Sequence, residues 1–84
     1  MEMHEELKNA ENRVVGLKQL LRELEACTVD CVYVAEDADE HVKRKIAEAI
    51  GGREIQVVSV PTMEELGSVC GIDVSAACAA ILKQ

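Results

Sequence analysis

The sequence predicts an α/β protein: a three-layer α/β/α sandwich on a mostly parallel or mixed sheet of about four strands. Two observations lead to this fold class. Short β-branched runs alternate with amphipathic segments of about ten residues, which is the pattern of βαβ units. Aromatic residues make up 1% of the chain, so small and aliphatic side chains must form the core, which favours helices packed closely on a sheet. With 84 residues and no visible linker, the chain is expected to form one domain over residues 1–84.

The first half of the chain predicts a helix, a strand, a helix and a strand in that order. Residues 2–12 are polar with few apolar anchors and predict a short helix, and residues 13–16 predict a short strand that ends in glycine. Residues 17–26 carry apolar side chains at the i, i+3, i+4 and i+7 positions of an amphipathic helix. Residues 31–35 form a β-branched apolar run that suits a buried strand.

The second half continues this alternation. Residues 39–50 predict an amphipathic helix that a pair of glycines ends, and residues 55–60 predict a strand. Thr62 is expected to cap a helix over residues 63–69. The final apolar segment, residues 76–82, cannot be assigned by periodicity. Its alanines favour a helix, whereas its position after a βα unit favours a strand.

The charge balance restricts the possible partners. Nine Lys and Arg against sixteen Asp and Glu give a net charge of −7, whereas a general polyanion binder is normally basic. Any nucleic acid must therefore be bound through a small local patch. The sequence has no apolar run of the roughly 18 residues that span a bilayer, and its first residues do not resemble a secretory signal. A cytoplasmic location without membrane partners is expected.

The four cysteines are expected to be reduced in that compartment. Three residues separate Cys27 from Cys31, in contrast to the two of a common zinc site, and no histidine lies near any cysteine in the sequence. Buried packing of Cys31 and Cys78 is the simpler interpretation. The sequence also suggests no Ser/His/Asp or Cys/His set, so it predicts no enzyme, no metal, no cofactor and no small-molecule substrate.

The strongest candidate site begins at Gly16, where a predicted strand passes directly into a helix. Lys18 and Arg22 are four residues apart and share one helical face, beside the amide of Gln19. Two cations and an amide at a positive helix start could hold phosphate or read the edges of guanines. From this pattern alone, a solvated helix face next to a tight glycine turn is the more common explanation.

Two other segments are also candidate sites. The carboxylates of residues 36–40 (EDADE) could bind Mg²⁺ or Ca²⁺, but an aspartate cap followed by acids in the first helical turn explains them without a ligand. In a later loop flanked by glycine, Ile72 and Val74 are either core side chains or an exposed apolar patch for a partner. The core interpretation is preferred from the pattern alone.

Three motifs, taken in order, resemble one known family. They are Gly16-x-Lys18-Gln19-x-x-Arg22, the strand end Ala35-Glu36-Asp37, and Leu66-Gly67-x-x-Cys70-Gly71-Ile72-Asp73-Val74-x-Ala76-Ala77. Their order and spacing are similar to those of the ribosomal protein L7Ae/L30e family, and the small size is similar to that of its bacterial members. The resemblance implies a four-stranded mixed sheet in which the last apolar segment is a strand. It also implies binding to kink-turn RNA, a duplex bent sharply at a bulge flanked by tandem G·A pairs, and a ribosomal or ribosome-associated role.

The resemblance further implies roles for individual residues. Gly16 would allow close approach of the RNA, and Lys18 and Gln19 would reach the guanines of the G·A pairs. Arg22, where the family usually has lysine, would contact phosphate or a guanine edge. The loop that would cover the bulged nucleotides consists of Ile72, Asp73, Val74 and Ser75. Such a site reads RNA shape through one helix start and one loop, which is possible for an acidic protein.

The chain also departs from the family pattern. Glu64 and Glu65 stand where the family commonly has lysines, and this reversal of charge weakens the electrostatic steering of RNA. Ala26 and Cys27 replace a frequent glycine after a helix, and Glu40 replaces a frequent proline. The alternative function is therefore an acidic protein-interaction module on the same fold, with weak or no RNA binding.

Overall fold

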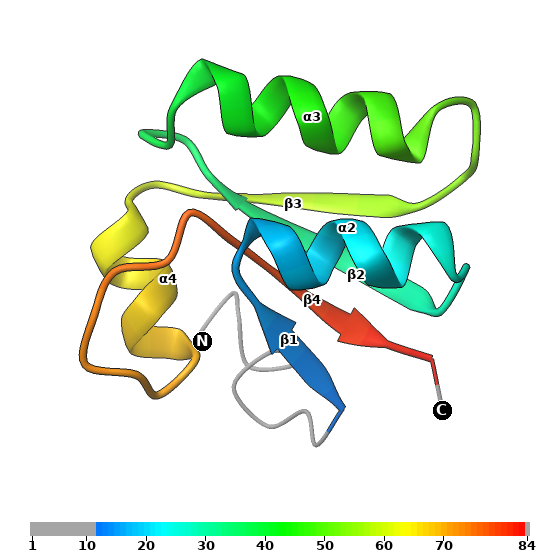
Figure 1. The fold of residues 1–84 in the computed structure, drawn as a ribbon. Coiled ribbons are helices and arrows are strands. Elements are labelled where there is room, and N and C mark those ends of the chain that lie inside the picture. The colour runs from blue at the N-terminus through cyan, green and yellow to red at the C-terminus, as the bar shows by residue number, and fades with distance from the viewer. Residues whose placement is uncertain (1–11, 84) are drawn as a thin grey trace.

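The computed structural model describes residues 12–83, which form a sheet with helices on both faces (Figure 1). The four strands are β1 (Arg13–Val15), β2 (Val29–Ala35), β3 (Gln56–Val60) and β4 (Cys78–Leu82). The three helices are α2 (Leu17–Glu25), α3 (Glu40–Ile50) and α4 (Met63–Val69). Of the helix predicted for residues 2–12, all but the last residue lies outside the described residues. No helix within residues 12–83 is long and apolar enough to cross a bilayer.

The sheet is mixed, with the strand order β1-β4-β2-β3. Strand β4 runs antiparallel to both of its neighbours, β1 and β2, whereas β2 and β3 are parallel. The last apolar segment is therefore a strand, and it occupies a central position. This order confirms the predicted fold class, and a solved structure described below has the same fold.

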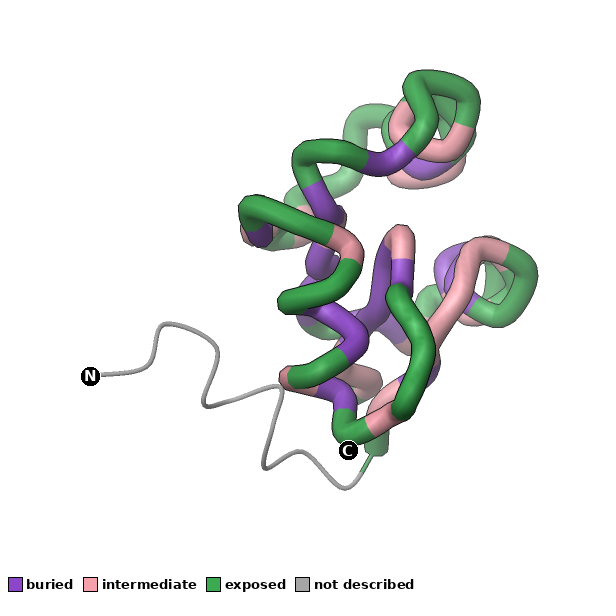
Figure 2. The backbone as a smooth tube through the Cα atoms, turned by 90° about the vertical axis from the view of Figure 1, so that its left-hand side faces the viewer, coloured by how far each residue is buried: buried purple, intermediate pink, exposed green. Residues whose placement is uncertain are grey.

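Two hydrophobic cores lie on opposite faces of the sheet. Helices α2 and α3 cover one face and α4 covers the other, so that the buried residues form the layer between them (Figure 2). The core under α2 and α3 is formed by Val14, Leu20, Leu24, Val29, Val32, Ile46, Cys78 and Ala80. The core under α4 is formed by Cys31, Tyr33, Ala35, Ala38, Val60, Leu66, Cys70, Ala76 and Ala79. These three layers are the predicted sandwich.

The alanines of β4 follow from its central position. Cys78, Ala79 and Ala80 are each 0% exposed, and Ala79 faces α4 while its two neighbours face α2. A central strand covered on both faces leaves room only for small side chains if the helices are to pack closely. Packing against the sheet thus overrides the helix propensity of alanine, which explains why periodicity could not settle this segment.

The predicted elements differ from the observed ones mainly at their ends. Strand β2 begins at Val29, two residues before the predicted start at Cys31. An irregularity in the pairing with β4 falls between Val29 and Cys31, and Asp30 there is exposed. The prediction was wrong at this end because the exposed carboxylate interrupts the apolar run by which the strand was recognised.

The C-terminal end of α2 contains a cysteine in a backbone conformation that favours glycine. Cys27 has φ +61°. Its N–H donates to the Leu24 carbonyl (3.2 Å), and the Thr28 N–H donates to the Glu23 carbonyl (3.1 Å). These are the two hydrogen bonds of a Schellman cap. The helix end therefore keeps the geometry of a glycine cap although the sequence supplies cysteine.

The cysteines fall into two groups. Cys31 and Cys78 are buried, as predicted, and so is Cys70, whereas Cys27 is exposed. None of the four is in a disulfide bond within the described part of the chain.

Candidate nucleic-acid interface

The predicted site residues gather at one end of the sheet, where β1, β2 and β3 finish and β4 begins. We call this the loop end. The Gly16 N–H donates to the Cys78 carbonyl (2.9 Å), which ties the start of α2 to the start of β4. The Ala35 N–H donates to the Ala77 carbonyl (3.0 Å), which ties the end of β2 to the same segment. The helix start and the loop before β4, far apart in sequence, are therefore neighbours (Figure 1).

Gly16 forms the corner between β1 and α2. Its φ of +100° and ψ of 154° suit glycine and strain other residues. A β carbon at this position would meet no atom within 4 Å. Glycine is thus required by the backbone conformation, and the space in front of the corner is open. No side chain within residues 12–83 caps the helix that starts here.

The first two turns of α2 present the predicted polar residues to solvent. Lys18, Gln19 and Arg22 are all exposed. On the opposite side of the helix, Leu20 and Leu24 are 0% exposed and anchor it to the sheet. This anchoring fixes the rotation of α2, so that Lys18 and Arg22 lie on one outward face as the spacing predicted.

The loop before β4 is held in place from both ends. At its start, Gly71 has φ +76°, its N–H donates to the Ser68 carbonyl (3.0 Å), and the Ile72 N–H donates to the Gly67 carbonyl (3.1 Å). These bonds make a Schellman cap on α4. At its end, the Ala76 N–H donates to the Met63 carbonyl (3.0 Å). The loop is thus bonded to both the first and the last turn of α4.

The side chains of this loop divide between the core and the surface. Ile72 is half-buried against the core under α4, whereas Val74 is 69% exposed and Asp73 and Ser75 are also exposed. The preferred prediction that both apolar residues fill the core is therefore wrong for Val74. Its backbone carbonyl packs so closely on Gly67 that a β carbon there would overlap it, and the Val74 side chain remains exposed. The loop offers one exposed apolar side chain.

Arg13 stabilises the loop end, a role that was not predicted from the sequence. Its guanidinium Nη2 donates to the Cys70 carbonyl at the end of α4 (2.8 Å). A cation at this position interacts favourably with the negative end of the helix. Burial raises the pKa of the Cys70 thiol, and the charge of Arg13 partly opposes this shift. Burial alone raises the pKa of Cys78 to about 11. The sequence signal for this role of Arg13 was no more than a single arginine in a predicted short strand.

The acidic run of residues 36–40 serves mainly to begin helices. The Asp39 carboxylate accepts from the His41 N–H (2.8 Å) and caps α3, as predicted. The Asp37 Oδ1 accepts from the Met63 N–H (2.8 Å) at the start of α4, a long-range cap that the sequence did not reveal. Within residues 12–83, no cluster of three His, Cys, Asp or Glu side chains is arranged to hold a metal ion.

One carboxylate lies beside the loop. Glu64, with Ser68 and residues 71–75, lines a shallow hollow of about 450 Å³. Both Glu64 and Glu65 belong to the first turn of α4, where the positive end of the helix favours negative side chains. The two glutamates that depart from the family pattern thus stabilise the start of α4, and Glu64 adds negative charge next to Val74.

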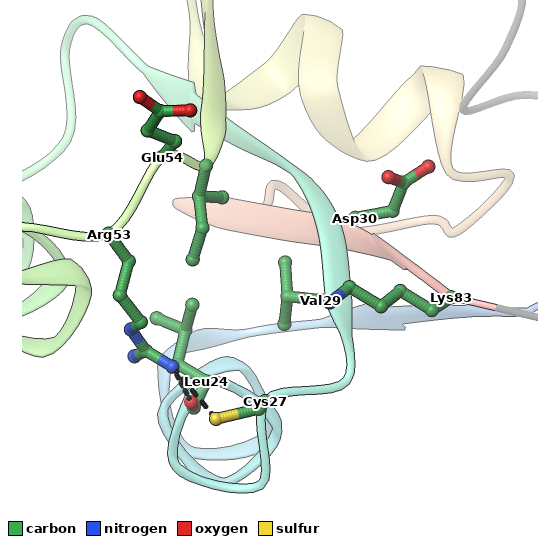
Figure 3. Close-up of a pocket in the computed structure, with 8 residues that line it drawn as sticks. Leu24, Cys27, Val29, Asp30, Arg53, Glu54 and Lys83 are labelled. Carbon is green, nitrogen blue, oxygen red and sulfur yellow. Dashed lines mark hydrogen bonds between the residues drawn. The ribbon is translucent and has the colours of Figure 1, made fainter.

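The opposite end of the sheet contains a pocket that no sequence pattern predicted (Figure 3). We call it the clamp end, because Arg53 joins the ends of two helices there. Its guanidinium donates to the carbonyls of Leu24 (2.8 Å), Ala49 (2.6 Å) and Ile50 (3.2 Å). The Cys27 thiol lies 3.2 Å from the same guanidinium. The pocket has a volume of about 330 Å³ and includes none of the predicted site residues.

Comparison with known proteins agrees with the resemblance found in the sequence. The model of the ribosomal protein L7Ae/L30e/S12e/Gadd45 family matches residues 1–84. A protein of Caldanaerobacter subterraneus named as RNA-binding is 54% identical over 68 residues, which cover 81% of this chain and 83% of that protein. RNA-binding protein YbxF of Geobacillus stearothermophilus is 38% identical over 80 residues, or 95% of this chain and 98% of that protein.

A ribosomal protein and a solved structure also match. Large ribosomal subunit protein eL8 of Halobacterium salinarum is 34% identical over 68 residues, which cover 80% of this chain and 57% of that protein. A structure from Bacillus halodurans C, described as a protein with unknown function, has a TM-score of 0.78 and 23% identity over 89% of this chain and 75% of that chain. The three sequence relatives are named as RNA-binding or ribosomal proteins, in agreement with the prediction that the protein is not an enzyme.

Proposed function

Because the chain belongs to the ribosomal protein L7Ae/L30e/S12e/Gadd45 family, we propose that it is an RNA-binding protein that recognises kink-turn RNA. A ribosomal or ribosome-associated role in the cytoplasm is part of this proposal. The hydrogen bond between Gly16 and Cys78 carries the argument, because it brings the open start of α2 next to the loop before β4. The cations and amide of α2 and the exposed apolar side chain of the loop then belong to the same end of the sheet.

Each part of this surface suits a different feature of a kink-turn. Lys18, Gln19 and Arg22 are exposed donors on the first two turns of α2, suited to guanine edges and phosphate in a widened groove. The bare backbone of Gly16 admits a close approach of the RNA. Val74 is exposed in the loop before β4, the strand whose first residue bonds to Gly16, and suits apolar contact with an unstacked base. Ile72 contributes by holding the loop on the core rather than by contact with the RNA.

A paired gel shift tests the proposal. The two RNAs are a kink-turn duplex and the same duplex with its G·A pairs replaced by Watson–Crick pairs, each measured at two salt concentrations. The proposal expects clear preference for the kink-turn at both. Equal binding to the two RNAs, or binding to neither, contradicts it. A stable protein partner that survives RNase treatment, together with no RNA preference, would favour the acidic protein-interaction module.

Substitutions assign the contacts. Lys18→Ala and Arg22→Ala should each weaken kink-turn binding by about 1–3 kcal/mol if they contact bases. Lys83→Ala is the matched control, because Lys83 is an exposed cation that follows β4 at the opposite end of the sheet. Wild-type affinity in the Lys18 and Arg22 variants would remove these residues from the site.

Glu64 provides a test in the opposite direction. Its carboxylate lines the hollow beside Val74, where it repels phosphate. Glu64→Gln should therefore strengthen kink-turn binding by about 2- to 5-fold at low salt and by less at high salt. Glu54→Gln, an exposed site at the clamp end, should change binding little. Equal effects of the two variants would show that only net charge matters.

A further inference from the structure

The exposed cations of this acidic protein are concentrated on two neighbouring helices. Eight of the nine Lys and Arg residues lie within the described part of the chain. Arg13 and Arg53 donate to backbone carbonyls, and Lys43 donates to the Glu36 carbonyl (2.6 Å) and lies 4.0 Å from the Glu40 carboxylate. Lys83 lies at the clamp end. Four exposed cations are left over: Lys18, Arg22, Arg44 and Lys45.

Lys18 lies in the first turn of α2 and Arg22 in its last turn, whereas Arg44 and Lys45 lie near the middle of α3. The two helices lie side by side on one face of the sheet, and both begin at the loop end (Figures 1 and 2). Leu21 and Glu25 of α2 and Ala49 of α3 line the depression between them. Lys18 and Arg22 belong to the same helical stripe as Leu21 and Glu25, and Lys45 lies one turn before Ala49. Lys18, Arg22 and Lys45 therefore border this depression on the side of the loop end, and Arg44 lies next to Lys45 on α3.

Acids flank these four cations on both sides. Toward the clamp end, Glu25 ends α2 and Glu48 lies in the last turns of α3. Toward the loop end, Glu36, Asp37 and Asp39 are exposed just before α3. In the first turn of α3, Glu40 is exposed, but it lies beside Lys43. A polyanion is therefore attracted to the strip formed by Lys18, Arg22, Arg44 and Lys45 and repelled by the acids on either side of it.

We infer that Arg44 and Lys45 extend the RNA-binding surface from α2 onto α3, where they contact phosphates of the duplex arm next to the kink. This inference rests on the proposed function, since the RNA is first placed by the loop end. An α-helix is about 10 Å across, so two adjacent helices span several phosphates of a duplex backbone. Contacts to phosphate hold the arm in register and add salt-dependent affinity without reading the sequence. Discrimination stays with Lys18, Gln19 and the loop.

The salt dependence of binding tests this inference. The variant is the double substitution Arg44→Gln and Lys45→Gln, because glutamine keeps the helix propensity and removes only the charges. Each lost phosphate contact should reduce the slope of log K against log salt by about 0.9, so the double variant should lose about 1.8. Its affinity should fall about 10-fold at 0.1 M salt, and its preference for the kink-turn over the G·A-disrupted duplex should not change.

Lys83→Glu is the matched control, because it changes the net charge by the same two units at the clamp end. A kink-turn whose arms are shortened to a few base pairs provides a second control, since it should remove the difference between wild type and the double variant. A wild-type slope in the double variant, or an equal change in Lys83→Glu, overturns the inference while leaving the proposed function intact. A wild-type protein that does not prefer the kink-turn overturns the proposed function and this extension with it.

Discussion

The loop end and the clamp end are both helix termini on one sheet, but they treat their cations in opposite ways. At the loop end, Lys18 lies in the first turn of α2 and is exposed to solvent, as is Arg22 one turn further along the helix. At the clamp end, Arg53 follows α3 and donates to three backbone carbonyls from the last turns of α2 and α3. Cationic side chains are therefore exposed to solvent at the loop end, whereas the cation at the clamp end is bonded to the backbone.

Helix direction explains this difference. The last turn of a helix has unpaired carbonyls and partial negative charge, so a cation placed there finds partners within the chain. The first turn has unpaired N–H groups and partial positive charge, so a cation there finds none and is weakly repelled. A cation near a helix start, such as Lys18, therefore costs some stability, whereas Arg22 in the last turn of α2 does not. Position along a helix thus explains why Arg53 donates to backbone carbonyls while Lys18 is exposed to solvent.

The largest expected effect comes from altering the packing that shapes the loop end. In Gly67→Ala, the new β carbon overlaps the Val74 carbonyl, and one of the two backbones must move. The free energy of unfolding should fall by about 3 kcal/mol, measured by urea denaturation, and kink-turn affinity of the folded protein should fall about 10-fold.

Gly52→Ala is the control for Gly67→Ala. A β carbon at Gly52 meets no atom within 4 Å, so its stability should change by less than about 0.5 kcal/mol. If Gly67→Ala were as stable as Gly52→Ala and bound RNA equally well, the loop would not depend on this contact.

Alkaline pH should expose a second difference between the two ends. Cys78 at the loop end is fully buried, and burial raises the pKa of its thiol from 9.0 to about 11. The unfolded thiol ionises first as pH rises, so the stabilisation is complete below pH 9 and is lost between about pH 9 and 11. The loss should reach about 2 kcal/mol at pH 11, measured as the difference in unfolding free energy between wild type and Cys78→Ala.

Cys27→Ser is the control for this pH experiment, because Cys27 is exposed at the clamp end. It should keep the wild-type dependence on alkaline pH. Parallel curves for wild type and Cys78→Ala would show that this thiol does not contribute.

The sequence predicted the fold because its signals are local or periodic. Apolar spacing located α2 and α3, and Asp39 and Thr62 cap their helices as expected. The shared outward face of Lys18 and Arg22 on α2 was likewise predicted from their spacing. Arg13, Asp37 and Arg53 were not recognised, because their partners Cys70, Met63 and Leu24 lie 57, 26 and 29 residues away. Such contacts depend on how the elements pack, and no short pattern records them.

The next prediction concerns the structural cation. Arg53→Ala removes hydrogen bonds to the ends of two helices and should lower the free energy of unfolding by about 1.5 kcal/mol. Kink-turn affinity of the folded protein should stay within about 2-fold of wild type, because the clamp end lies away from the RNA-binding surface. Arg22→Ala should show the reverse pattern, with weaker RNA binding and little change in stability. Loss of RNA affinity in Arg53→Ala without loss of stability would contradict the division between the two ends.

The smallest expected effect concerns the cysteine that stands in a glycine conformation. Cys27 has φ +61°, which costs a residue with a β carbon about 1–2 kcal/mol. Cys27→Gly relieves this strain but gives up the contact with the Arg53 guanidinium, so the protein should become more stable by about 1 kcal/mol in urea denaturation. Cys27→Ala keeps the strain and loses the contact, so it should be no more stable than wild type. If the alanine variant were stabilised as much as the glycine variant, the positive φ of Cys27 would not be the source of the lost stability. The contact between the Cys27 thiol and the Arg53 guanidinium would then be the unfavourable feature.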